Sequence, residues 1–174
     1  MARQLWLLRH AEAEPHGTRT DAARRLTERG RAQARAAGIA IECLQGGFEA
    51  VLFSPKVRAR ETAELAGEGW EPQQRELLAV HPPLAGGFDV SQALDAASGV
   101  TADGRLLMVG HEPDLSHVVG QLTGGRVDVK KGGLAIVRLE SPAHAASGEL
   151  VALMRPRELA LIAGEVGGVP IHGD

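Results

Sequence analysis

Short apolar runs alternate with longer amphipathic stretches along the whole chain. The apolar runs predict buried strands and the amphipathic stretches predict helices, because a helix repeats its apolar face every three to four residues. The expected strands occupy residues 4–8, 50–53, 76–80, 105–109, 134–139 and 149–154. The expected helices occupy residues 27–44, 55–67, 113–122 and 156–163. Strands that alternate with helices in this way are typical of an α/β sandwich with a largely parallel sheet.

The last two apolar runs, at 134–139 and 149–154, follow each other with no helix between them, so we expect a hairpin-type pair. Such a pair makes the sheet mixed at one side. The fold class predicted here is therefore a three-layer α/β/α sandwich around a central, mainly parallel sheet. We expect a single domain over residues 1–163 and a flexible, Gly-rich tail at 164–174.

Polar residues mark where the first two helices begin. Thr27 is the expected N-cap of the first helix, and Gly46-Gly47 is expected to end it. Ser54 is the expected N-cap of the second helix, with Pro55 in its first turn.

Charge and cysteine content restrict the partners and the cellular location that the sequence predicts. The formal net charge is −3, which argues against a nucleic acid or an anionic membrane as partner. No apolar stretch is long enough to span a bilayer, and the N-terminal residues lack the organisation of a signal peptide. The single cysteine, Cys43, cannot form an internal disulfide, and we expect a buried, inert thiol. Together these features predict a cytoplasmic protein.

Three of the predicted strands end in residues that can carry out catalysis. The first ends in Arg9-His10, the second leads through Ser54-Pro55 to Arg58, and the fourth ends in Gly110-His111. In an open α/β sheet, binding sites form outside the carboxyl ends of the strands. We therefore expect Arg9, His10, Arg58 and His111 to share one pocket.

Two arginines and two histidines in one pocket favour phosphoryl chemistry. Arginine presents a fork of N–H donors that matches the oxygens of phosphate, although a carboxylate would also fit. A histidine among arginines has a lowered pKa, and its neutral ring can attack phosphorus directly. The second histidine can donate to oxygens that gain charge in the transition state. The N-terminus of the helix that carries Arg58 also favours an anion.

Other site types find no support in the sequence. There is no G-x-S-x-G segment of a hydrolase and no Walker-type phosphate loop. The spacing of His111 and His117 matches no common zinc pattern, so no metal site is predicted. Lys130-Lys131 is expected in a solvated turn, and His16 in a loop without a role.

Four segments resemble motifs of the histidine phosphatase superfamily, the phosphoglycerate mutase-like group. Leu8–Glu12 resembles its Arg-His signature, and Arg25–Gly30 resembles the opening of its first helix. Ser54–Ala63 and Val109–Pro113 resemble its arginine segment and its second histidine segment. The short chain and Gly132–Ala135 resemble the small branch of phosphohistidine phosphatases called SixA.

This resemblance implies that His10 is the phosphorylated nucleophile and that Arg9, Arg58 and His111 bind the phosphoryl group, without a metal or other cofactor. Larger members carry a carboxylic general acid after the third strand, but the corresponding stretch, residues 76–94, is short here. Three carboxylates remain as candidates for the acid, and we do not rank them. They are Asp21, Glu12 and Glu76. A reaction without a protein acid also stays open, because an imidazole leaving group needs less help than an alkoxide.

The sequence thus predicts a metal-independent phosphatase that forms a phosphohistidine intermediate. Because the short insertion is expected to leave the pocket open, the preferred substrate is phosphohistidine in a partner protein. Two alternatives stay open. One is a phosphatase of a small phosphomonoester, and the other is a non-catalytic module that binds phosphorylated partners.

Overall fold

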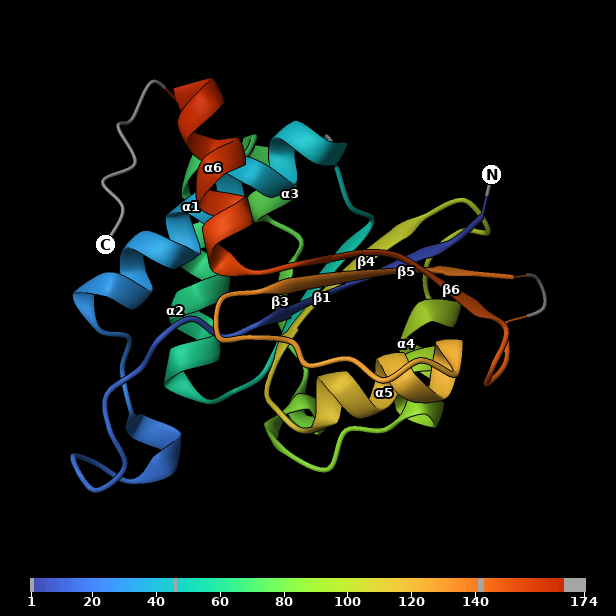
Figure 1. Ribbon diagram of the computed structural model, residues 1–174, viewed down its shortest axis with the longest axis horizontal. Coiled ribbons are helices and arrows are strands. Elements are labelled where there is room, and N and C mark those ends of the chain that lie inside the picture. The colour runs from blue at the N-terminus through green and yellow to red at the C-terminus, as the bar shows by residue number, and fades with distance from the viewer. Residues whose placement is uncertain (1, 46, 141–142, 168–174) are drawn as a thin grey trace.

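A six-stranded sheet runs through the centre of the molecule, with helices on both faces (Figure 1). The computed structural model describes residues 2–45, 47–140 and 143–167. The strands are β1 (Gln4–Arg9), β2 (Ala50–Phe53), β3 (Leu78–Val80), β4 (Arg105–Gly110), β5 (Leu134–Leu139) and β6 (Gly148–Met154). The α-helices are α1 (Glu28–Gln45), α2 (Val57–Ala66), α3 (Pro72–Arg75), α4 (Val90–Ser98), α5 (Asp114–Thr123) and α6 (Pro156–Gly167).

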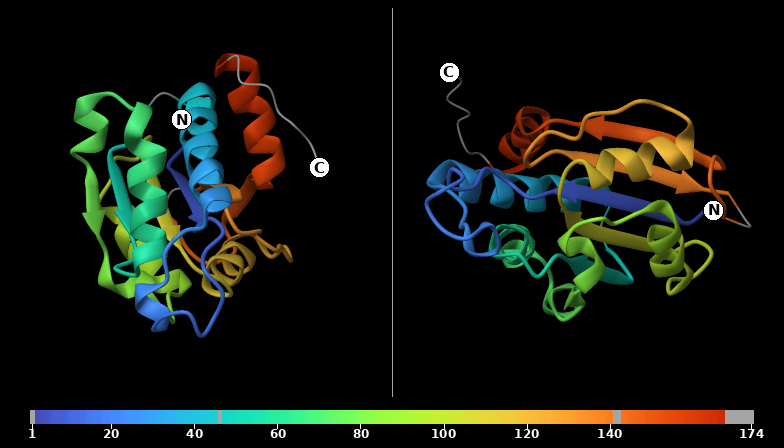
Figure 2. Two further views of the ribbon diagram at one scale, coloured as in Figure 1. Left: turned by 90° about the vertical axis from the view of Figure 1, so that its left-hand side faces the viewer. Right: turned by 90° about the horizontal axis from the view of Figure 1, so that it is seen from below.

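The sheet has the strand order β3-β2-β4-β1-β5-β6. The first four strands of the chain are parallel, whereas β5 is antiparallel to β1 and β6 is antiparallel to β5. Helices α1, α2, α3 and α6 lie on one face, with α1 and α6 side by side, and α4 and α5 lie on the other (Figures 1 and 2). The predicted three-layer sandwich with a sheet mixed at one side is confirmed.

The central strand β1 explains why its sequence is an unbroken apolar run. Leu5 and Leu7 pack with α4 and α5 in one core, while Trp6 and Leu8 pack with α1, α2 and α6 in the other. A strand that is covered on both faces has no side that must be polar. The same burial fixes the register of the strand and carries its last residues, Arg9 and then His10, to the carboxyl edge of the sheet.

Two of the expected helix starts have different outcomes. Thr27 Oγ accepts a hydrogen bond from the Gly30 amide at 3.0 Å, which confirms the N-cap of α1. Ser54 does not cap α2, because that helix begins at Val57 and Lys56 occupies the N-cap position. The Ser54 side chain is instead buried in the site described below.

The third strand and the segment after it also differ from the prediction. The third strand is shorter than expected, and α4 was not predicted at all. Asp89 caps this helix in a capping box with Gln92, a signal that the sequence contains.

Two further expectations are wrong. Cys43 is exposed, because it follows Ile41 by two residues on α1, and Ile41 faces the core, so the thiol points away from the sheet. Residues 164–167 belong to α6 rather than to a tail, and residues 168–174 lie outside the described residues. Within the part of the chain that the structure describes, no helix is long and apolar enough to cross a membrane.

Candidate active site

The structure brings Arg9, His10, Arg58 and His111 together in one pocket of about 560 Å³. This follows from the strand order, because β1, β4 and β2 are neighbours and their carboxyl ends meet at one edge. The His10 amide donates to Gly110 O at 3.0 Å, so the two histidine segments are joined through their backbones.

His10 presents a neutral ring whose Nε2 carries the free electron pair. Its Nδ1 lies 2.8 Å from Ala11 O, and because a carbonyl only accepts, Nδ1 must hold the proton. Arg58 Nε donates to His10 Nε2 at 3.2 Å. Burial, reinforced by the charges of His111, Arg58 and Arg9, lowers the pKa of His10 to about 3. The ring is therefore uncharged at neutral pH and can act as a nucleophile.

Asp21 holds the cations on this side of the pocket. Its backbone oxygen accepts from Arg58 at 2.5 Å, and its carboxylate lies 3.3 Å from the Arg58 guanidinium. The same carboxylate binds Arg24 at 2.7 Å and Lys56 at 2.9 Å. Hydrogen bonds from Arg24 and Lys56, with the charge of Arg58, hold the pKa of Asp21 well below its usual range. Asp21 therefore stays ionised and positions cations, so it does not serve as a general acid.

The other two acids considered from sequence do not line the pocket. Glu12 accepts a hydrogen bond from the Thr27 hydroxyl at 2.8 Å and belongs to the start of α1. Glu76 is exposed and ends α3, just before β3 begins, so it lies at the opposite end of the sheet. Neither carboxylate is therefore placed in the pocket as a proton donor.

His111 faces His10 across the pocket, with ring centroids 5.1 Å apart. Its Nε2 lies 2.8 Å from Ser54 Oγ, a contact that the sequence did not reveal. Burial, followed by the charges of Arg58 and Lys56, lowers the pKa of His111 to about 3. Nδ1 of His111 is buried without a hydrogen-bond partner.

Arg9 is anchored at one end only. Its guanidinium donates to Val129 O at 2.9 Å, while its Nε is buried without a partner. Buried polar atoms are normally hydrogen-bonded, so an unpartnered one in a pocket is available to a ligand. Arg9 Nε and His111 Nδ1, both from residues that line the pocket, fit the oxygens of a phosphoryl group.

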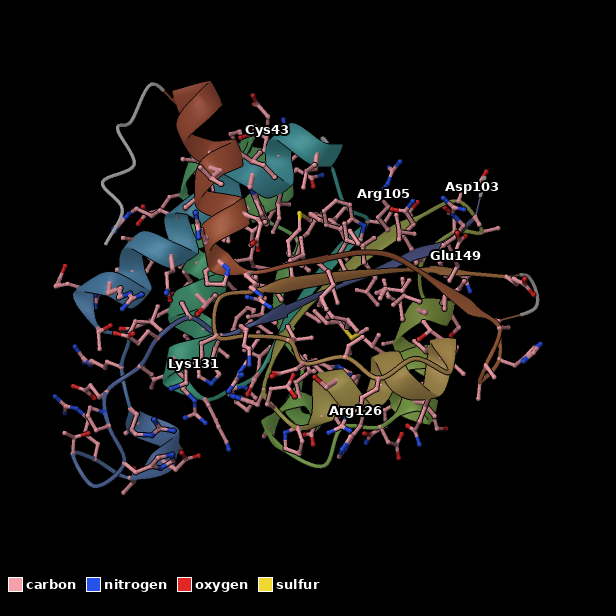
Figure 3. All side chains as sticks on the ribbon, viewed as in Figure 1. Cys43, Asp103, Arg105, Arg126, Lys131 and Glu149 are labelled. Atoms are coloured by element: carbon pink, nitrogen blue, oxygen red, sulfur yellow. The ribbon has the colours of Figure 1, made fainter. Side chains whose placement is uncertain are left out.

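Several pocket residues were not expected from the sequence. Lys131 lies in an exposed turn, as predicted, and it also lines the pocket, because the next residue, Gly132, donates its amide to His10 O at 3.0 Å. Figure 3 shows Lys131 at this end of the sheet and Glu149 at the other. His16 also lines the pocket. The remaining charged residues that the sequence did not assign to the site are Glu14, Arg24, Lys56, Glu112 and Asp114.

Among the described residues, no group of three or more His, Cys, Asp or Glu side chains is arranged to hold a metal ion. Arginine and lysine side chains line the pocket beside His10 and His111.

The profile of the histidine phosphatase superfamily (branch 1) matches residues 5–79, the segment that carries Arg9, His10 and Arg58. The chain belongs to the histidine phosphatase superfamily. This membership implies phosphatase activity. An uncharacterised protein of Picosynechococcus sp. is 32% identical over 144 residues, which cover 78% of this chain and 84% of that protein.

Solved structures of the superfamily share the fold. The protein histidine phosphatase SixA complexed with tungstate is 25% identical, with a TM-score of 0.76 over 90% of this chain and 99% of that one. The α-ribazole phosphatase from Shigella flexneri is 20% identical, with a TM-score of 0.64 over 88% and 96% of the two chains. The chain therefore resembles SixA, and the fold itself is shared with enzymes of other substrates.

Proposed function

We propose that this histidine phosphatase removes phosphoryl groups from phosphohistidine in a partner protein, by way of a phosphorylated His10. The observation that carries the proposal is the neutral His10 ring, whose Nε2 electron pair faces a pocket lined by arginines. Phosphoryl transfer needs a positioned nucleophile and charge stabilisation more than covalent help, and these residues supply both.

The proposed reaction has two steps. His10 Nε2 attacks phosphorus in line, and the bond to the leaving group breaks. Arg58 exchanges its contact with Nε2 for a phosphoryl oxygen, while Arg9 Nε and His111 Nδ1 donate to the remaining oxygens. Water then attacks phospho-His10 from the opposite side, and the electron pair of the P–N bond returns to Nε2.

The wall of the pocket next to β3 supports a protein-borne substrate. This wall is contributed by Ala85, Gly86 and Gly87, and the space beside the two glycines is open. A rim without large side chains lets a bulky partner bring its phosphoryl group close to the backbone. The likeness to the protein histidine phosphatase SixA points in the same direction. The cytoplasmic location expected from the single cysteine stays a prediction.

The nucleophile can be tested by trapping. The protein is mixed with 4-nitrophenyl phosphate and quenched in base, which preserves phosphohistidine, and its intact mass is measured. The wild type is expected to gain one phosphoryl group, and His10→Ala to gain none. His117→Ala, which removes an exposed histidine on α5, is the matched control and should behave as the wild type. An adduct that persists in His10→Ala, or a wild type with neither adduct nor turnover, contradicts the proposal, and the latter favours a binding module.

The substrate class is tested separately. Values of kcat/KM are compared for a histidine-phosphorylated carrier protein, phosphoserine and a sugar phosphate. The proposal expects the phosphoprotein to be preferred by about 100-fold or more, because binding energy from a large partner is added to that of the phosphoryl group. A sugar phosphate or phosphoserine with the higher value would identify a small-molecule phosphatase with the same catalytic site.

A further inference from the structure

Glu112 directly follows His111 at the carboxyl end of β4 and lines the same pocket as His10. Its Oε1 is buried and has no hydrogen-bond partner among the described residues. Burying a carboxyl oxygen without a partner costs free energy. A functional role beside the two histidines would explain why Glu112 is buried there.

The other carboxylates of the pocket already have partners. Asp21 binds three cations, as described above. Glu14 accepts from the Arg25 amide at 2.9 Å and from Arg19 at 3.0 Å. Asp114 accepts from the Phe88 amide at 3.1 Å. Of the acidic residues that line the pocket, Glu112 alone keeps a buried oxygen with no donor.

The pKa of Glu112 is shifted in the opposite direction to that of Asp21. Burial raises the pKa of Glu112, and this effect outweighs hydrogen bonds from Ser116 and the charge of Arg9, which act in the opposite direction. A carboxyl group that holds its proton more firmly than usual is better suited to proton donation than an ordinary glutamate.

The segment that follows β3 supplies no competing acid. It contributes only Ala85, Gly86 and Gly87 to the pocket, and none of these carries a proton to donate. The larger relatives were expected to place their acid after the third strand, whereas this chain brings a carboxyl group from β4.

We propose that Glu112 is the proton donor to the leaving group and then the base that activates water, an inference that rests on the proposed role of His10. In the first step, the His10 Nε2–P bond forms, the bond from phosphorus to the leaving atom breaks, and the Glu112 proton moves to that atom. In the second step, the Glu112 carboxylate takes a proton from water, the new O–P bond forms, and the Nε2–P bond breaks. Glu112 ends protonated and His10 ends neutral, as both began.

The test uses aryl phosphates whose leaving groups differ in basicity. 2,4-Dinitrophenolate leaves without a proton, whereas phenolate needs one. For Glu112→Gln, kcat/KM should stay within about threefold for 2,4-dinitrophenyl phosphate and fall about 100-fold for phenyl phosphate. Glu149→Gln, the same change at an exposed position on β6 at the opposite end of the sheet (Figure 3), should alter neither.

A conservative variant and a pH profile show whether Glu112 transfers a proton or only packs in the pocket. Glu112→Asp keeps a carboxyl group and should recover part of the phenyl phosphate activity. The wild type should lose this activity as the pH rises through the pKa of Glu112, and Glu112→Gln should lack that part of the profile. If Glu112→Gln does not fold, Glu112→Asp and the wild-type profile still give the answer.

The results also distinguish this inference from the proposed function. A loss that is equal for both aryl phosphates, or no loss, overturns the role of Glu112 while phosphorylation of His10 stands. A wild type that shows no His10-dependent adduct overturns the proposed function itself, and the role of Glu112 falls with it.

Discussion

The two sides of the pocket are built differently. On the side of β1 and α2, Arg58 contacts both His10 and Asp21, at distances of 2.5 to 3.3 Å. On the side of β4, His111 Nδ1 and Glu112 Oε1 are buried without partners. The first side is held together by contacts within the protein, whereas the second keeps polar atoms without a partner.

Asp21 is the reason for this difference. Three cations close together repel one another, and one carboxylate that contacts all three offsets that repulsion and fixes Arg58. Asp21 also acts on His111, but burial and the charges of Arg58 and Lys56 outweigh it. The pKa of His111 is therefore lowered and its ring stays neutral.

The largest expected effect comes from removing the central cation of the organised side. Arg58→Ala should lower kcat/KM by about 10³-fold, because the guanidinium contacts His10, the proposed nucleophile, and would hold phosphoryl oxygens. Steady-state kinetics with an aryl phosphate measure the loss. Arg60→Ala, an exposed arginine on the same helix, should change kcat/KM little. Equal losses in the two variants would mean that net charge, rather than position, matters.

The two neutral histidines should make the fold sensitive to acid. An unfolded histidine has a pKa of about 6.5, whereas both are lowered to about 3 in the folded state. Between these values the unfolded chain binds protons that the folded chain does not, so stability is complete above pH 6.5 and is lost as the pH falls. Each histidine should remove about 1.4 kcal/mol of unfolding free energy per pH unit in this window.

Urea unfolding at pH 7 and pH 4.5 measures this loss. His10→Asn has one titrating ring fewer, so its stability should fall less steeply than that of the wild type. If the wild type and His10→Asn lose the same unfolding free energy between these pH values, protonation of His10 does not destabilise the fold.

Removing the charge of Asp21 should make the Arg58 side of the pocket less firmly held. Asp21→Asn keeps the shape but leaves Arg24, Lys56 and Arg58 without their shared carboxylate. We expect kcat to fall about tenfold, because Arg58 is no longer held in place. Glu68→Gln, which removes an exposed partner of Arg35, serves as the control. An unchanged kcat would show that Arg58 is positioned without Asp21.

The smallest expected effect is on the β4 side. Ser54→Ala removes the hydroxyl that contacts His111 Nε2, which should lower kcat/KM roughly two- to tenfold, the worth of one hydrogen bond. Ser54→Thr keeps the hydroxyl and should retain most of the activity. If both variants behave alike in kinetic assays, the contact does not orient His111.

Local patterns were sufficient to predict most strands but not the connections. The strands at 50–53 and 134–139 were predicted with their observed bounds, because their runs are short, apolar and flanked by turn residues. The role of Ser54 was missed, since a serine before a proline has the same local signature whether it caps a helix or binds a distant histidine. Cys43 was misplaced because a helical pattern alone leaves the buried face uncertain at its end.

The sequence by itself determined the family, the fold class and the four residues Arg9, His10, Arg58 and His111, because each lies in a motif next to a recognisable strand or helix. Only the tertiary structure decided what the carboxylates do. Asp21 and Glu112 are ordinary acidic residues in the sequence, and their opposite pKa shifts arise from neighbours distant along the chain and from burial. The role proposed for Glu112 could not be found by local reasoning, since the chemistry of its carboxyl group depends on which groups surround it after folding.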